Sequence, residues 1–176
     1  MPRFNTRVAI VLVSTIAAIL VVAAAQPSRI NDSSERARFI GTWELVSTEY
    51  QFADGSKRPY ADLGKDAKGY LIYAADGHMC AELMNPNRPK WKDSRNPTDE
   101  EKVSAIAGFI AYCGRYEIDV TNHVVYHYPD VAWMPNWSGT RQVRPYKLDG
   151  DILVFSDKTT DQPPIVGYAI SWRKLK

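Results

Sequence analysis

Three side chains capable of acid–base or metal chemistry fall close together in one short run, His78-Met79-Cys80-Ala81-Glu82. If the run is a strand, residues two apart share a face about 6.6 Å from each other, a span that two ligands of one metal ion can bridge. No third ligand is evident, so no metal site is predicted. An inward Glu82 would have a raised pKa and could serve as a general base. The alternative is that this face is hydrated, because alternation does not say which face is inside.

The other two histidines, His123 and His127, are four residues apart. On a strand they share a face but lie about 13 Å apart, whereas a zinc–nitrogen bond is about 2 Å long. One metal ion therefore cannot bind both. His127 joins Glu82 and His78 as a candidate for acid–base chemistry. The chain has no G-x-S-x-G motif and no catalytic cysteine signature, so no nucleophile is predicted.

Aromatic side chains provide the best evidence for a binding site. The chain has ten tyrosines and five tryptophans, and buried tyrosine hydroxyls suit a cavity that orients a ligand. An inward arginine would suit a ligand carboxylate. The alternative is a filled core, because aromatic residues dominate packing in any small barrel. The residues that we predict to line a ligand cavity are Tyr70, Ile72, Tyr112, Tyr116, Tyr126, Trp137 and Arg144.

Strand-like runs that would position these residues alternate with turn signals along most of the chain. Asp-Gly pairs mark hairpins, and one helix is expected to begin after Thr98, with Glu101 completing a capping box. Val103, Ile106, Ala107 and Ile110 give that helix an apolar stripe. Eight antiparallel strands close into a barrel that is either filled or holds one small ligand. The predicted strands are 42–50, 69–73, 78–84, 111–118, 123–128, 137–146, 152–156 and 166–175.

Several motifs in this order resemble the lipocalin-like domain family of bacteria and fungi. They are GTWELVS, GYLIYAADGHM, AYCGRYEID, PNWSGTRQVRPYKLDGDIL and SWRKL, and the resemblance covers roughly residues 38–175. The resemblance implies a calyx-shaped, all-β fold: an eight-stranded antiparallel up-and-down barrel with one short inserted helix. It implies little about activity.

The first and last strands carry the residues that would close this barrel. Gly41-Thr42-Trp43 matches the G-x-W of lipocalins, and Arg173 falls where that superfamily sets an arginine across the tryptophan. We therefore expect the Arg173 guanidinium to lie over the Trp43 indole, an interaction of about 0.5–2 kcal/mol. Gly41 would leave room for their close approach.

The N-terminal segment has the composition of an export signal. Residues 1–7 carry Arg3 and Arg7 and no acid, and residues 8–25 are apolar or small throughout. A basic region, an apolar region and an A-x-A site predict a secretory signal cleaved after Ala25. The alternative is an uncleaved anchor, because 18 helical residues span about 27 Å. Both alternatives place the folded part outside the cytoplasm, in the periplasm or secreted, and any membrane contact would be through 8–25.

The remaining chain is predicted to be a tether, residues 26–37, followed by a single barrel domain, residues 38–176. Without the first 25 residues, basic and acidic side chains are equal in number. A neutral domain without a basic cluster argues against nucleic acid and against anionic lipid as partners. No cofactor is expected.

Cys80 and Cys113 are the two cysteines of the chain, and both fall in strand-like runs. An oxidising compartment permits a disulfide between them. The alternative is a pair of small buried thiols.

The sequence favours an exported barrel that binds a small hydrophobic molecule or lipid, with an enzyme on the same scaffold as the first alternative. That enzyme would perform isomerase- or lyase-type acid–base chemistry through Glu82, His78 or His127. The second alternative is a structural barrel with a solid core and no ligand.

Overall fold

The computed structural model describes residues 29–176 of the chain, with side chains for 33–159 and 163–176. The predicted signal or anchor, residues 1–25, lies outside the described residues. Within the part that is described, no helix has the length and apolar character needed to cross a membrane.

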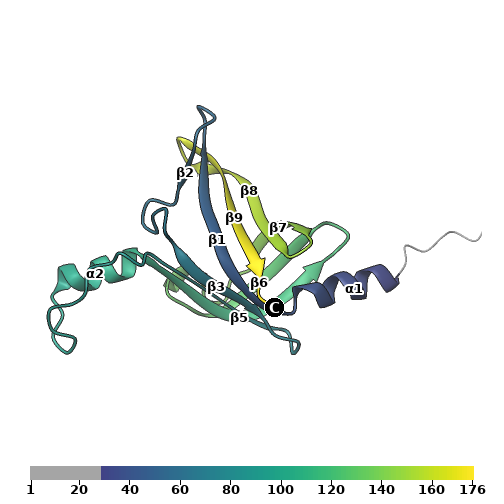
Figure 1. Ribbon diagram of the computed structural model, residues 1–176, viewed down its shortest axis with the longest axis horizontal. Coiled ribbons are helices and arrows are strands. Elements are labelled where there is room, and N and C mark those ends of the chain that lie inside the picture. Colours follow the sequence, from purple (N-terminus) through teal and green to yellow (C-terminus); the bar gives the residue numbers. More distant parts are fainter. Residues whose placement is uncertain (1–28) are drawn as a thin grey trace, which may run out of the picture.

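Nine antiparallel strands form one sheet in the order β2-β1-β3-β4-β5-β6-β7-β8-β9, and β1 also pairs with β9. This last pairing closes β1 and β3–β9 into an eight-stranded barrel, to which the short β2 adds at one end of β1 (Figure 1). The predicted barrel is therefore confirmed. The strands are β1 Gly41–Phe52, β2 Lys57–Pro59, β3 Lys68–Tyr73, β4 His78–Met84, β5 Phe109–Asp119, β6 Val124–Ala132, β7 Gln142–Asp149, β8 Ile152–Gln162 and β9 Ile165–Lys174.

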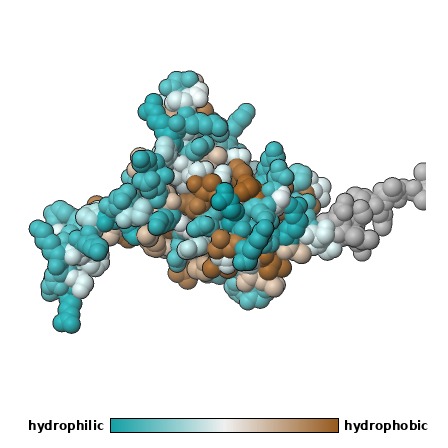
Figure 2. All heavy atoms as spheres, viewed as in Figure 1, coloured by the Kyte–Doolittle hydropathy of each residue, from teal (hydrophilic) through white to brown (hydrophobic). Residues whose placement is uncertain are grey.

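Alternation along the strands places one residue set inside the barrel and the other outside. In β4 the burial alternates strictly through Met79, Ala81 and Leu83, which are 2–4% exposed. The inward set of the whole sheet forms one continuous core that includes two fully enclosed tryptophans, Trp43 and Trp172. Figure 2 shows that the molecule's ends are mainly hydrophilic, while apolar residues surface over the middle of the barrel.

The last residue of helix α1, Arg29–Phe39, closes one end of the barrel, while the rest of the helix extends away from it (Figure 1). Phe39 is fully buried there, and its ring meets Tyr73 and Tyr146 edge-on at centroid distances of 5.7 and 4.9 Å. The Trp43 indole N–H donates to the Phe39 carbonyl at 2.8 Å, and the Tyr146 hydroxyl donates to Glu35 at 2.6 Å. The predicted tether, 26–37, therefore runs into a helix that takes part in the core.

The cation beside Trp43 is Lys174, where the sequence had suggested Arg173. Lys174 lies opposite Trp43 in the β1–β9 register, and its Nζ is 5.3 Å from the centre of the indole ring. Arg173, one residue away, faces the opposite side of the sheet and is exposed. Gly41 has a φ of 131°, and a Cβ there would lie 3.2 Å from the Lys174 side chain, so glycine does leave room for the cation.

A β-bulge extends β6 through a segment predicted to be loop. The β5–β6 register shifts between Cys113 and Gly114, and Pro129 sits at this irregularity, where its missing N–H costs no ladder hydrogen bond. The strand predicted at 137–146 begins later, because residues 135–137 form the 3₁₀ turn η1, Pro135–Trp137.

The helix α2, Asp99–Ala107, has the predicted capping box. Thr98 Oγ1 accepts from the Glu101 N–H at 3.3 Å, and Glu101 accepts from the Thr98 N–H at 2.8 Å. Its apolar stripe is not packed, since Val103 and Ile106 are 68% and 54% exposed. The helix projects away from the barrel wall (Figure 1).

The two cysteines lie directly opposite each other on β4 and β5, with their Cα atoms 4.1 Å apart. In the structure they form a disulfide. It joins the two strands that the long segment containing α2 separates in sequence.

Candidate ligand-binding cavity

A cavity of about 560 Å³ occupies the barrel at the end opposite α1. Its volume lies within the range of small-molecule sites, about 300–1,000 Å³. Side chains of several strands and of the loops after β2 and β6 form its wall, and exposed residues such as Asp62 and Lys158 border it. Its apolar and aromatic lining consists mainly of Leu63, Leu71, Ala81, Leu83, Ile110, Trp133, Met134, Trp137, Phe155, Ile170 and Trp172.

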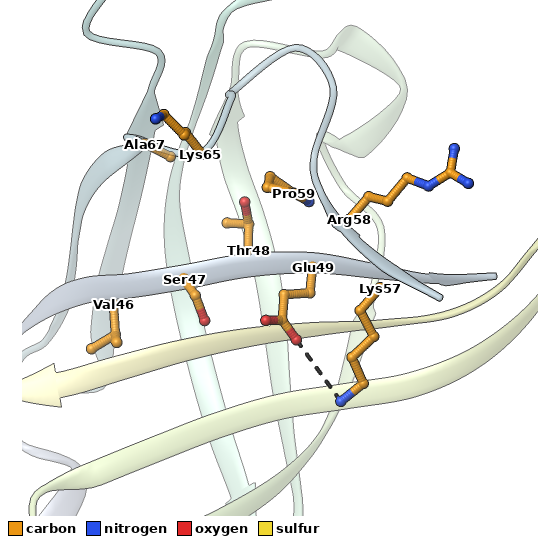
Figure 3. A pocket seen from close by; sticks show the side chains of 9 residues that line it. All are labelled: Val46, Ser47, Thr48, Glu49, Lys57, Arg58, Pro59, Lys65 and Ala67. Carbon is orange, nitrogen blue, oxygen red and sulfur yellow. Dashed lines mark ion pairs between the residues drawn. The ribbon is translucent and has the colours of Figure 1, made fainter. Parts of the chain in front are cut away.

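Two smaller depressions lie elsewhere on the surface. One, of about 230 Å³, lies beside β1 and β2 and includes three basic residues. Figure 3 shows that these cations do not converge: Arg58 extends away, and Lys57 reaches across β1 to Glu49 at 4.0 Å, far from Lys65. The other, of about 340 Å³, lies outside the barrel over β3 and β4. The barrel cavity is therefore the candidate site.

Three of the seven predicted lining residues line the cavity: Tyr112, Trp137 and Arg144. Tyr70 and Ile72 lie on the outer face of β3, 51% and 43% exposed, because Leu71 and Tyr73 take the inward positions. Those two predictions were wrong.

The remaining two predicted residues also lie away from the cavity. Tyr126 faces outward between the buried Val125 and His127, and Arg141 lies over its ring at 5.0 Å. Tyr116 points inward but toward the closed end, where its hydroxyl donates to the Ala74 carbonyl at 2.9 Å. Gly114 separates it from Tyr112 along the same face.

His127 is the central polar group of the interior, and it is fully buried. Its Nε2 lies 2.6 Å from the Tyr73 hydroxyl, and its Nδ1 lies 2.9 Å from the Tyr112 hydroxyl. Burial, and to a smaller degree the charge of Arg144, holds the pKa of His127 well below its usual 6.5. The imidazole is therefore neutral near pH 7, with one nitrogen that donates and one that accepts.

The direction of the hydrogen bonds that link Tyr73, His127 and Tyr112 follows from the donors and acceptors that each group has available. Tyr73 is 1% exposed, and among the described residues its hydroxyl bonds only to His127. A buried hydroxyl donates where an acceptor exists, so Tyr73 donates to Nε2. The imidazole proton is then on Nδ1 and is donated to Tyr112. The Tyr112 proton remains available, and Tyr112 is the member of the chain that lines the cavity.

Arg144 brings a positive charge to the cavity. Its guanidinium donates to the Val143 carbonyl at 3.1 Å and to the Gln142 side chain at 3.4 Å, and its Cζ lies 6.0 Å from the Trp137 ring centre. Its charge opposes the effect of burial on the pKa values of Tyr112 and Tyr168, which burial raises. Arg144 forms no ion pair with any residue whose side chain the structure describes.

Two indole N–H groups of the cavity wall lack acceptors. Trp133 Nε1 and Trp172 Nε1 are both buried and have no hydrogen-bond partner within the described part of the chain. An unpaired buried N–H costs about 1–3 kcal/mol. Because these nitrogens are enclosed within the wall, the donors that we assign to the cavity are Tyr112 and Arg144.

The acid–base candidates of β4 are outside the barrel. Glu82 is exposed, opposite Tyr70 in the β3–β4 register. His78 is exposed at the start of β4, where its Nδ1 lies 3.2 Å from Asp76. Neither lines the cavity, so the structure does not bring them together with His127. No group of three or more His, Cys, Asp or Glu in the described residues could hold a metal ion.

Three tyrosines of the mouth were not among the sequence predictions: Tyr50, Tyr60 and Tyr168. Tyr50 and Tyr60 stack at 4.0 Å, and burial raises the pKa of both hydroxyls. Tyr50 shares its strand face with Thr48, which is 4% exposed. Tyr60 follows β2 in a loop, where no periodicity marks it. Trp172 was also missed, although it alternates with the exposed Arg173.

Comparison with known proteins identifies the fold family. The lipocalin-like domain model matches residues 40–171. The chain is also 31% identical over 110 residues to the 4'-hydroxy-3'-methoxypropiophenone carrier protein of Aspergillus oryzae, a match covering 55% of this chain and 96% of that protein. No solved structure matches it. The closed barrel and these matches show that the chain belongs to the lipocalin-like domain family.

Proposed function

We propose that this protein is a carrier that binds a small, largely apolar molecule in the barrel cavity. The observation that supports it most is the 560 Å³ space at one end of an otherwise packed barrel, walled by apolar and aromatic side chains. A solid structural barrel would fill this space with side chains, as Phe39 and Tyr146 fill the other end.

The relative from A. oryzae supports a ligand with an aromatic ring. Its name describes it as the carrier of an aryl ketone. The wall of the cavity offers an array of aromatic rings. The Trp137 ring meets the Tyr112 ring edge-on at a centroid distance of 5.4 Å and the Trp133 ring at 6.4 Å. Such an edge-to-face array is a favourable wall for a flat ring.

Calorimetric titration with alkyl aryl ketones tests this proposal. Ile170→Phe adds volume inside the cavity, whereas Ile72→Phe adds the same volume on the outer face of the barrel. We expect the wild type and Ile72→Phe to bind with equal affinity and Ile170→Phe to bind at least about tenfold more weakly. Absence of binding heat in the wild type, or equal weakening by both variants, would contradict a cavity carrier.

We also propose that the protein acts outside the cytoplasm. The apolar segment 8–25 and the Cys80–Cys113 disulfide support this location, because disulfides persist in oxidising compartments. Cell fractionation of the full-length chain, with sequencing of its N-terminus, tests it. Export with cleavage would give a product that begins at Gln26, whereas a product recovered from the cytoplasm would contradict the proposal.

A further inference from the structure

We propose that the cavity binds its ligand through an oxyanion, with Arg144 as the counter-ion and the Tyr112 hydroxyl as a hydrogen-bond donor. The ligand class is then a small apolar or aromatic molecule that carries a carboxylate or an ionised acidic phenol. This inference rests on the proposed carrier function and assigns a ligand class to the same cavity.

The first support is the uncompensated charge of Arg144. Arg144 is half-buried, and partial removal of a guanidinium from water is costly unless an anion or a full set of acceptors surrounds it. Its hydrogen-bond acceptors are the Val143 carbonyl, the Gln142 amide oxygen and the hydroxyl oxygens of two tyrosines, and all of them are neutral. These two tyrosines are Tyr112 and Tyr168. The carboxylates that border the cavity, Asp62 and Asp157, are exposed to solvent.

The second support is the direction of the Tyr73–His127–Tyr112 chain. With the imidazole proton on Nδ1, as inferred above, Tyr112 accepts from His127, and its own proton is free to be donated. Burial keeps the hydroxyl protonated by raising its pKa. Arg144, the other polar group beside Tyr112, has no acceptor to offer. The acceptor for the Tyr112 proton must therefore come from the cavity contents.

The third support is the aromatic wall beside the two polar groups. Trp137 lies beside both Arg144 and Tyr112, so an aromatic ring could pack on the wall while its oxygen reaches the two polar groups.

Matched ligand pairs separate charge from shape. One pair is para-hydroxypropiophenone and para-methoxypropiophenone, and the other is phenylpropanoate and phenylpropanamide. In each pair only the first member can be an anion. Calorimetry on the full chain, in buffer alkaline enough to ionise the phenol, measures both affinities. We expect each anion to bind about tenfold or more tightly than its neutral partner.

Two variants locate the effect. Arg144→Met removes the charge and keeps an extended side chain, and Tyr112→Phe removes only the hydroxyl. Each should reduce the preference for the anion to less than about threefold. The matched control is Arg141→Met, because Arg141 lies outside the barrel over Tyr126 and should leave the preference unchanged. Near-ultraviolet circular dichroism verifies that each variant has native packing.

The absorption spectrum gives a readout that needs no variant. Bound para-hydroxypropiophenone should show the phenolate band at a pH at which the free compound is still mainly protonated. Equal affinities within both pairs, with the phenol band unshifted, would overturn the oxyanion inference and leave the carrier function standing. Binding of none of the four probes would overturn both. Preference for one anion only identifies which oxyanion the cavity accepts.

Discussion

At the scale of single residues, His127 connects the packed core to the cavity. It is fully enclosed and still makes two side-chain hydrogen bonds, to Tyr73 and Tyr112. Each of the three side chains buries a polar atom, and burying that atom without a hydrogen-bond partner would destabilise the fold. The three residues therefore form one hydrogen-bonded unit, and its Tyr112 end faces the cavity.

His127 should make the stability of the protein dependent on pH. Below its usual pKa of 6.5 the unfolded chain gains a proton that the folded protein excludes, so the free energy of unfolding falls as the pH falls. We expect a loss approaching about 1.4 kcal/mol per pH unit between pH 6.5 and 5. Urea unfolding at several pH values measures it.

The control for this pH dependence is a pair of histidine variants. His127→Gln keeps one donor and one acceptor but does not titrate, so the slope should be reduced by about one proton. His78→Gln changes an exposed residue and should retain the slope. Equal slopes for wild type and His127→Gln would contradict the buried, neutral imidazole.

At the scale of elements, β4 and β5 carry both covalent and steric constraints. The disulfide joins their facing residues, and beside it β6 forms a bulge, with one more residue than β5 between the paired positions. Strand positions could be predicted well here, because alternation and turn residues are local signals. The bulge could not, because Pro129 alone reads as a strand end, and the register shift depends on how β5 meets it.

The same limit explains which site residues the sequence found. Tyr112, Trp137 and Arg144 line the cavity, whereas Tyr70 and Ile72 point outward. Alternation separates the two faces of a strand, but only its partners decide which face is inside. In β3 the inward face is the one that carries Leu71 and Tyr73, because these two side chains pack in the core of the closed barrel.

Removal of the disulfide should destabilise the barrel. Its cysteines are 33 residues apart, and a loop of this length predicts a loss of about 3–4 kcal/mol. Chemical denaturation of the Cys80→Ala/Cys113→Ala variant, compared with wild type, measures the loss. A reductant should shift the wild-type midpoint and leave the variant unaffected, and an unchanged wild-type midpoint would show that the bond contributes nothing.

Gly114→Ala should be destabilising at the bulge. A Cβ at this position would lie 2.0 Å from the Tyr128 carbonyl oxygen, so the two strands must separate, at a cost of about 1–3 kcal/mol. Thermal unfolding measures this. Gly150→Asn is the control, since that turn has open space and a φ of 54° that asparagine tolerates. Similar losses at both sites would contradict the steric explanation.

At the scale of the whole molecule, the barrel has two unlike ends. Aromatic side chains, including Phe39 at the end of α1, fill one end, and the cavity occupies the other. The packed core and the candidate cavity therefore lie at different places along the barrel axis, so mutations at the two ends should have separable effects.

Phe39→Ala tests this separation. The side chain is fully buried between Tyr73 and Tyr146, and its loss should cost about 3–5 kcal/mol of folding free energy. Ile40→Ala, at a residue 39% exposed, should cost far less. Ligand affinity of the folded fraction should be unchanged in both, as measured by calorimetry well below the melting temperature. A parallel loss of affinity in Phe39→Ala would show that the ends are coupled.

The closed end of the barrel, where Phe39 packs against Tyr146, has a kinetic consequence for ligand exchange. With Phe39 and Tyr146 occupying the floor, a bound molecule leaves by the route along which it arrived. A competing ligand cannot enter from the closed end while the first ligand is still bound. Exchange must then be strictly sequential, and the dissociation rate of a preloaded ligand should be the same whatever the concentration of its competitor.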